Sequence, residues 1–361
     1  MRLLLAALLV GLVPSSASAV GRTGSAVMLL RDGRVVRVGI PDGAGLAERR
    51  LGATASPSQE RGHLIAVRGR ELFVLVPSRP AVLASLVGDS LRMRWRRTLE
   101  AGVSYRAVVL TGSRLYAVGY RPGRIVDKEL RYREAAAVIT VIGTDGTHVR
   151  SSAIRPAQGH DWWEWWASTS ADGRRLAVAW HGGCGPNSAP LCTTGADLLD
   201  VTRNGAQRCT AHGMRSNAGC IPDVHGMIEP FRGGWIATTG EEPLLVLDER
   251  GRVVRRLHSG FHSEHLMSFV VDAAHDRVLV LSVCYLGREG LRSVSLRDGM
   301  SRLVRHSACG SDPVLGPGTT VLAVAAPKIY PAPVLVAFDA SSGRTVLRRR
   351  FRTGILAVAS G

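Results

Sequence analysis

The chain of 361 residues has almost no lysine: Lys128 and Lys328 are the only two among 46 basic residues, and the rest are arginine. Aromatic residues make up only 5% of the sequence. It contains no C-x2-C pair, no phosphate-binding glycine loop and no Gly-x-Ser-x-Gly turn. These absences argue against a zinc module, a P-loop nucleotide enzyme and a serine hydrolase of the nucleophile-elbow type.

Long hydrophobic runs are also missing, apart from one of 11 residues at positions 3–13. Met1 and Arg2 precede this run, and Ala17-Ser18-Ala19 follows it. That order is typical of a secretory signal peptide, and the run is too short to span a bilayer. We therefore expect a signal peptide at 1–19, one domain at 20–361, and a secreted or extracytoplasmic product.

Seven tight turns recur along the chain, each between two short apolar runs. They lie at Asp32-Gly33, Gly88-Asp89, Asp145-Gly146, Asn204-Gly205, Arg250-Gly251, Asp298-Gly299 and Ser342-Gly343. Successive turns are 44 to 59 residues apart. A turn residue that tolerates positive φ, placed between two strands, predicts a β-hairpin, and repeated spacing predicts an array of similar units.

Six weaker hairpins alternate with these turns, and one hairpin of each kind makes a four-stranded antiparallel unit. Complete units are expected at about 62–99, 104–154, 165–210, 228–257, 267–305 and 313–350. A hairpin at 26–40 and a tail at 353–361 remain, and pairing them would complete a seventh sheet without exposed strand edges. The sequence therefore predicts an all-β, seven-bladed β-propeller of four-stranded blades, closed by its N- and C-terminal strands.

Two segments carry a family resemblance. The stretch AFDASSGRTVLRRR at 337–350 resembles the repeat of pyrroloquinoline-quinone-type propellers, in which a strand ending in Asp leads into a Ser/Thr-Gly turn. LLVLDERGRVVRRL at 244–257 is a looser copy. Tryptophan-aspartate repeat propellers are a more distant comparison. The resemblance implies propeller blades built from these hairpins.

The formal net charge is +17, and the arginines gather on the last strand expected in each unit. Runs occur at Arg92, Arg94, Arg96 and Arg97, at Arg252, Arg255 and Arg256, and at Arg348, Arg349, Arg350 and Arg352. Charge on edge strands discourages aggregation between sheets, which is the interpretation we favour. The alternative is weak attraction to polyanions such as acidic envelope polymers.

Long loops are expected on one face of the propeller and short turns on the other. The long loops comprise 41–61, 120–135, 181–195, 211–227, 258–266, 306–312 and 326–332. All six cysteines fall in or beside them, and an even number of cysteines in an exported protein predicts disulfides. Of the 15 pairings that six cysteines permit, we expect neighbours to pair: Cys184 with Cys192, Cys209 with Cys220, and Cys284 with Cys309.

Histidines collect on the same face. His63, His160, His225 and His265 each precede or begin an innermost strand, with Asp312 at the matching place in another unit. Imidazoles converging at the mouth of a central channel would suit a divalent metal, held by His160, His225, His262, Glu264 and His265. The alternative is that the strand-start histidines join buried hydrogen-bond networks, as a Gly-His pair does in tryptophan-aspartate propellers.

The segment GHDWWEWW at 159–166 holds four of the seven tryptophans. Neighbouring residues of a strand point to opposite sides, so packing between blades would use these indoles. The alternative is a ligand-binding surface made of Asp161, Trp162, Trp163, Glu164, Trp165 and Trp166. Asp161 and Glu164 are three residues apart on one strand, which is a poor arrangement for glycoside hydrolysis.

Taken together, these features predict an exported, monomeric, non-catalytic binding propeller that engages a small molecule, glycan or protein through its disulfide-stapled loop face. The alternative function is a metal-assisted lyase or hydrolase with a histidine-lined site at the channel mouth. The sequence does not identify the ligand.

Overall fold

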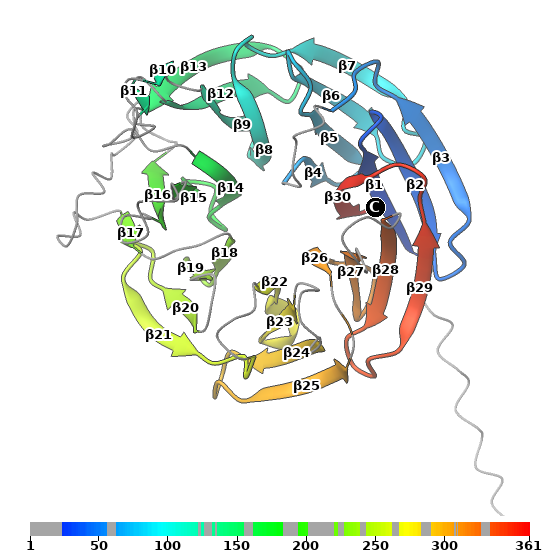
Figure 1. The fold of residues 1–361 in the computed structure, drawn as a ribbon, viewed down its shortest axis with the longest axis vertical. Helices are drawn as coiled ribbons and strands as arrows, with labels where there is room; N and C mark the ends of the chain where they lie inside the picture. Colours follow the sequence, from blue (N-terminus) through cyan, green and yellow to red (C-terminus); the bar gives the residue numbers. More distant parts are fainter. Residues whose placement is uncertain are drawn as a thin grey trace, which may run out of the picture.

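The computed structural model describes residues 24–55, 63–121, 124–125, 132–133, 136–154, 162–182, 194–200, 220–222, 227–238, 243–261, 267–282, 290–306, 308, 310–325 and 333–361. Strands dominate, and four-stranded antiparallel sheets are arranged around a common axis (Figure 1). The protein is thus an all-β propeller with four-stranded antiparallel blades. Within the described ranges, no helix has the length and apolar character that a membrane crossing requires.

Six of the four-stranded sheets each come from one continuous stretch of chain. Their strands, from the axis outward, are β4 (Ile65–Arg68), β5 (Glu71–Val76), β6 (Val82–Val87) and β7 (Met93–Thr98); β8 (Ser104–Thr111), β9 (Arg114–Arg121), β12 (Ala136–Gly143) and β13 (His148–Ile154); β14 (Trp162–Thr169), β15 (Arg175–Gly182), β16 (Thr194–Asp200) and β17 (Cys220–Pro222); β18 (Ile228–Phe231), β19 (Gly234–Ala237), β20 (Leu244–Leu247) and β21 (Val253–Leu257); β22 (Met267–Asp272), β23 (Arg277–Ser282), β24 (Gly290–Ser295) and β25 (Ser301–His306); and β26 (Ser311–Leu315), β27 (Thr320–Ala325), β28 (Val334–Asp339) and β29 (Thr345–Arg350).

The remaining four-stranded sheet joins the two ends of the described chain. It contains β30 (Ile355–Ser360), β1 (Gly24–Leu30), β2 (Arg34–Ile40) and β3 (Gly45–Arg50), again from the axis outward. β1 and β30 are antiparallel, with Ala26 opposite Ser360 and Met28 opposite Val358. In Figure 1 the C-terminus accordingly lies beside β1.

Two short elements interrupt this pattern. A two-stranded sheet of β10 (Arg124–Ile125) and β11 (Tyr132–Arg133) lies in the connection between β9 and β12. A 3-10 turn, η2 (Ala273–His275), links β22 to β23. The connection at 120–135, expected to be a plain long loop, therefore contains a small hairpin of its own.

The innermost strands, β4, β8, β14, β18, β22, β26 and β30, contact one another in sequence, and β30 also contacts β4. Both faces of a blade are buried against neighbouring blades. In β1, Val27 and Leu29 belong to one hydrophobic cluster with Phe73 of β5, whereas Met28 belongs to another with Leu322 of β27. The two-residue alternation of a strand thus serves two inter-blade interfaces at once.

Two expected boundaries are wrong. Residues 45–50, assigned from the sequence to a long loop, form β3, so the Asp32-Gly33 turn joins the second and third strands of its sheet. β3 was missed because five of its six residues are exposed and it lacks apolar alternation. The unit expected to end at residue 210 instead takes β17 as its fourth strand, so Cys220 lies in that strand and not in a blade-to-blade loop.

The outermost strands are β3, β7, β13, β17, β21, β25 and β29, and the three arginine runs predicted from the sequence lie on or beside β7, β21 and β29. Arg94, Arg96 and Arg97 lie in β7, and Arg348 and Arg350 lie in β29. Each of these strands has one unpaired edge in its sheet. The position of the arginines therefore fits the protection of exposed strand edges.

Candidate functional site at the propeller axis

His63 lies two residues before the start of the innermost strand β4 and reaches across the inner part of the ring. Its Nδ1 lies 2.8 Å from the carbonyl oxygen of Ala167 in β14, and its own carbonyl accepts a bond of 2.7 Å from the amide of Val108 in β8. A carbonyl oxygen can only accept, so Nδ1 carries the proton and Nε2 presents a lone pair. In the described part of the chain, Nε2 has no hydrogen-bond partner.

Trp166 supports His63 from β14. The two rings are stacked, with centroids 5.2 Å apart and an interplanar angle of 15°. The indole Nε1 donates a hydrogen bond of 3.0 Å to Oε1 of Glu229 in β18. A second bond between the same strands, from the Ser168 hydroxyl to the Ile228 carbonyl at 2.6 Å, fixes β18 against β14.

His63, Trp166 and Glu229 therefore form one group, called the axial triad below, that spans three blades. Trp166 is only 9% exposed, and its two polar neighbours lie on its face and at its Nε1 edge. The innermost strands begin where the chain arrives from the preceding blade. His63 precedes β4 and Glu229 is the second residue of β18. Both therefore lie toward the face of the propeller at which the innermost strands begin.

The surroundings shift the pKa values of both titratable members. Burial raises the pKa of Glu229 to about 7, although the indole hydrogen bond favours the charged form. Burial also lowers the pKa of His63, against the opposing effect of its bond to Ala167. At neutral pH the site thus combines a neutral imidazole with a carboxyl group that is partly protonated.

This combination can do two things chemically. The Nε2 lone pair accepts a hydrogen bond, and the carboxyl group of Glu229 both donates and accepts one while protonated. A carboxyl group with a pKa near neutrality can also give up or take a proton at physiological pH. Within the described residues, no set of three or more His, Cys, Asp or Glu side chains is arranged to hold a metal ion.

Of the predicted ligand-binding residues, Trp166 is the one whose side chain is described. Its indole is buried, stacked by His63 and bonded to Glu229, which fits the packing interpretation better than an open stacking surface. Trp162, Trp163, Glu164 and Trp165 lie on β14, but their side chains are outside the described set, as is Asp161 altogether.

The other sequence-based sites fall largely outside the described residues. These are His160, His225, His262, Glu264 and His265 of the metal hypothesis, and Cys184, Cys192, Cys209, Cys284 and Cys309 of the disulfide hypothesis. Cys220 is described only as part of the backbone of β17. Both hypotheses therefore stay predictions.

Glu229 is the member of the axial triad that sequence reasoning missed. It is the one charged residue in the short strand Ile228-Glu229-Pro230-Phe231. A carboxylate in an innermost strand, where apolar residues predominate, was the signal that could have identified it. His63 was identified, and its bond to a backbone carbonyl agrees with the buried-network interpretation of the strand-start histidines.

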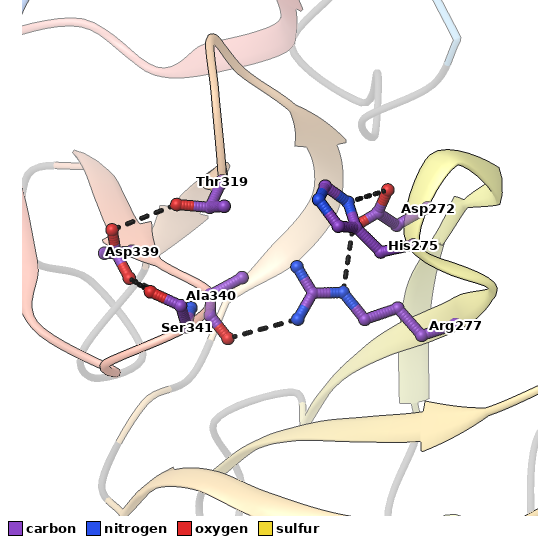
Figure 2. A network of polar contacts seen from close by, with 7 residues as sticks. All are labelled: Asp272, His275, Arg277, Thr319, Asp339, Ala340 and Ser341. Carbon is purple, nitrogen blue, oxygen red and sulfur yellow. Dashed lines mark hydrogen bonds and ion pairs between the residues drawn. The ribbon is translucent and has the colours of Figure 1, made fainter. Parts of the chain in front are cut away.

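A second polar cluster lies where the β22–β23 turn of one blade meets the β28–β29 turn of the next blade (Figure 2). Asp272 is 4% exposed and accepts bonds from His275 Nδ1 at 2.9 Å and from Arg277 Nε at 2.8 Å. Arg277 also reaches the Ala340 carbonyl of the next blade, 3.5 Å away. Burial works to raise the pKa of Asp272, but the bonds from His275 and Arg277 outweigh it and lower the pKa. This cluster satisfies its own polar groups and joins two blades.

Comparisons with known proteins support the fold. No family model matches the sequence, and no curated protein is significantly similar to it. Among solved structures, the chain is similar to the periplasmic gluconolactonase PpgL of Pseudomonas aeruginosa, with 15% identity, a TM-score of 0.60, and 94% of this chain and 99% of that chain covered.

Two further structures give the same result. A putative 6-phosphogluconolactonase from Bacteroides fragilis has 9% identity and a TM-score of 0.59, with 96% of this chain and 99% of that chain covered. Apo AztD from Citrobacter koseri has 12% identity and a TM-score of 0.55, with 94% and 98% covered. At these identities the similarity concerns the fold alone, and the chain is a β-propeller.

Proposed function

We propose that the protein is an exported, non-catalytic binding propeller whose ligand contacts the axial triad. The observation that carries this proposal is the arrangement of His63 and Glu229 on one buried indole. Trp166 holds both polar groups in place before any ligand arrives, and preorganised polar groups lower the cost of binding. The predicted signal peptide at 1–19 and the periplasmic location named for PpgL support export.

The ligand that fits this chemistry is a small, neutral, polyhydroxylated ring. Each hydroxyl group can donate to Nε2 of His63 and accept from the protonated carboxyl group of Glu229. A ligand that needs an aromatic face fits less well, because His63 covers a face of Trp166. We expect the predicted disulfide loops on the side where the innermost strands begin, so they would surround the approach to the triad.

We propose one domain at 20–361 that forms a closed ring of seven blades, related to the pyrroloquinoline-quinone-type propellers. Support comes from the pairing of β30 with β1 and from the contacts of β30 with both β26 and β4. The disulfides Cys184–Cys192, Cys209–Cys220 and Cys284–Cys309 are part of the proposal as well, with Cys220 in strand β17.

Isothermal titration with a panel of a hexose, a hexono-1,5-lactone and a hexonate tests the binding site. We expect saturable binding of the hexose or the lactone, the two neutral members, with one site per chain, and weaker binding of the anionic hexonate. His63→Phe keeps a ring to stack on Trp166 but removes both nitrogens, so it should weaken binding about tenfold, the equivalent of one hydrogen bond. His306→Phe, on the exposed outer strand β25, is the matched control and should leave binding unchanged.

Failure of every panel member to bind, or equal loss in the two variants, contradicts a polyhydroxylated ligand at the axial triad. Folding of each variant is checked by its thermal unfolding midpoint. Because Trp166 and the bonds between β14 and β18 remain in place, His63→Phe should unfold within a few degrees of the native protein.

Hydrolysis of such a ligand is a second candidate, favoured by the pKa of Glu229 near 7. In this scheme Nε2 of His63 takes a proton from a water molecule as the water oxygen bonds to the lactone carbonyl carbon. The ring C–O bond then breaks, and the carboxyl group of Glu229 protonates the departing oxygen. Two of the structurally similar proteins are named as lactonases, one of them putatively. Lactone opening above the spontaneous rate, abolished by either Glu229→Gln or His63→Phe, would support it.

A metal-assisted form of this second candidate depends on His160, His225, His262, Glu264 and His265. Metal analysis of protein purified without a histidine tag tests it directly. One equivalent of bound divalent metal, lost in a His225→Ala variant, is the result that would support a metal site at the channel mouth.

A further inference from the structure

Charge in this propeller is separated along the radius of the ring. The seven outermost strands hold 13 arginines and one acidic residue, Glu48. The arginines are Arg49, Arg50, Arg94, Arg96, Arg97, Arg150, Arg255, Arg256, Arg302, Arg305, Arg348, Arg349 and Arg350. The seven innermost strands have the opposite balance, with Glu164, Glu229, Asp272 and Asp312 against Arg68 and Arg106.

Protection of strand edges does not account for this imbalance. A charge of either sign discourages sheets from associating edge to edge, so edge protection alone does not require all but one of these charges to be positive. Nor does a shortage of acidic residues explain it, because the whole chain has 29 Asp and Glu beside 46 Lys and Arg. The sign of the charge on the outer strands therefore calls for a separate cause.

The seven outermost strands are called the rim below. Some arginines of the rim have structural partners. Arg349 donates to the carbonyl of Gly43 in the next blade, and Arg94 pairs with Glu71. The single acidic residue of the rim, Glu48, is paired with Arg34, 3.2 Å away, and offers no free charge to its neighbours Arg49 and Arg50.

Four exposed arginines on two adjacent outer strands are left without such partners: Arg49 and Arg50 in β3, and Arg348 and Arg350 in β29. None of their guanidinium groups forms a hydrogen bond or an ion pair within the described residues. The bond from Arg349 to Gly43 ties the two blades together, so the four guanidinium groups belong to one stretch of rim. Arginine binds phosphate through paired N–H groups, which makes phosphate the matching anion.

From this separation we propose that the rim binds an extended, flexible polymer of phosphate groups, with Arg49, Arg50, Arg348 and Arg350 at the centre of the contact. Figure 1 shows that the outermost strands form the convex circumference of the ring. A flat bilayer touches such a rim along only a short arc, and duplex DNA is too stiff to curve around it. A flexible single chain can follow it from blade to blade.

The test is binding of long-chain polyphosphate as a function of salt. We expect the logarithm of the association constant to fall linearly with the logarithm of the NaCl concentration. The variant Arg49→Gln, Arg50→Gln, Arg348→Gln, Arg350→Gln should bind at least tenfold more weakly at 0.1 M NaCl. It should also reduce the slope by up to about 3, since each phosphate contact on a single-stranded polyanion contributes about 0.7.

The matched control removes the same charge away from the rim: Arg70→Gln, Arg79→Gln, Arg114→Gln, Arg174→Gln. Arg70 and Arg174 are 88% and 75% exposed and lie in turns between first and second strands. This control should bind polyphosphate within about twofold of the native protein. An equal loss in the two variants would show attraction to net charge only and would overturn the proposal.

Two further probes are compared with polyphosphate. One is a vesicle that contains phosphatidylglycerol, and the other is a DNA duplex of 30 base pairs. At equal phosphate concentration we expect both to bind more weakly than polyphosphate. Tighter binding of either would overturn the flexible-polymer assignment, as would the absence of salt-dependent binding by the native protein. This test is independent of the axial triad, and His63→Phe should bind polyphosphate as the native protein does.

Discussion

Arg305 in the outermost strand β25 donates a hydrogen bond of 2.7 Å to the carbonyl oxygen of Gly343, in the β28–β29 turn of the next blade. The same relationship recurs around the ring. Arg255 in β21 donates to the carbonyls of Leu296 and Arg297 at 3.0 Å, and Trp95 in β7 donates to the carbonyl of Thr144 at 2.8 Å. The turn between the third and fourth strands of one blade is thus held by a donor on the outer strand of the blade before it.

Replacement of Gly343 should break this contact. Gly343 has a φ of +73°, and a Cβ atom there would lie 2.3 Å from the carbonyl oxygen of Val304. Gly343→Ala should therefore cost about 3 kcal/mol of unfolding free energy, from the strained backbone together with the clash. Chemical denaturation monitored by tryptophan fluorescence measures it.

Gly102 is the matched control, because its φ is +78° and a Cβ atom there would meet nothing within 4 Å. Gly102→Ala should cost only the backbone strain, about 1 kcal/mol. If both variants lose the same free energy of unfolding, the close approach between neighbouring blades at Gly343 does not contribute to stability.

The positions of these turns could be predicted from the sequence, but their contacts with the preceding blade could not. Asp298-Gly299 and Ser342-Gly343 were recognised because a residue tolerant of positive φ stood between two apolar runs, and both are turns in the structure. Their second role, as acceptors for the preceding blade, depends on residues about 40 positions away, and no local pattern encodes it.

Asp339 should contribute most of the stability of the β28–β29 turn. It accepts hydrogen bonds from the amides of Ser341 and Ser342 at 2.9 and 2.8 Å. It also accepts one from the Thr319 hydroxyl at 3.0 Å (Figure 2). Burial works to raise the pKa of Asp339, but these bonds outweigh it and hold the pKa well below its ordinary range. Asp339→Ala should cost about 2 kcal/mol near neutral pH, because it leaves several donors without an acceptor.

The pH dependence gives a second readout for Asp339. A carboxylate with a lowered pKa in the folded state contributes stability above its unfolded pKa of 3.8, and this is lost as the pH falls toward the folded value. The difference between native protein and Asp339→Ala should be constant from pH 8 to 5 and shrink below pH 3.8. Asp42→Ala, which removes a single bond to the Ala44 amide, is the control and should cost less than half as much at pH 7.

Removal of β30 tests the joining of the two chain ends. Residues Ile355 to Ala359 are all buried, and the strand pairs with β1 while contacting β26 and β4. A chain that stops at Gly354 loses roughly 5–10 kcal/mol of apolar burial, comparable to the whole stability of a typical domain, and exposes an edge of β1. We expect a fall of more than 10 °C in the unfolding midpoint, or soluble oligomers on size-exclusion chromatography.

Deletion of Gly361 alone is the control, since it removes only one hydrogen bond to the Ser25 carbonyl. A monomeric truncated chain with an unchanged midpoint would contradict a structural role for the β1–β30 pair. The tail at 353–361 was recognised from the sequence because its apolar run had no partner within its own unit. β3 was not recognised, because it is exposed for nearly its full length.

The axial triad marks the limit of prediction for the site. His63 was singled out by its place before an innermost strand, but its stacking on Trp166 and the link to Glu229 arise only when three blades meet. Strand alternation decides which face a residue takes within a sheet, whereas the approach of neighbouring innermost strands decides which side chains touch. A single sequence contains the first kind of information in its local pattern but not the second.

Glu229→Gln should stabilise the protein in a pH-dependent way. Because burial raises the pKa of Glu229 from 4.5 to about 7, the folded state binds its proton more tightly than the unfolded state does. The native protein therefore loses stability as the pH rises between these values, by up to about 3 kcal/mol above pH 8. Glutamine keeps an oxygen acceptor for the Trp166 indole and cannot ionise, so the variant escapes this loss.

Urea denaturation of native protein and Glu229→Gln from pH 4 to 8.5 measures the effect. The variant should be the more stable protein at pH 8.5, and its advantage should disappear by pH 4, where the native carboxyl group is protonated in both states. Glu249→Gln, in an exposed turn, controls for the loss of one carboxylate. If the advantage of Glu229→Gln is the same at every pH, the carboxyl group is not held protonated by burial, and the proton-donating role proposed for it at the propeller axis is wrong.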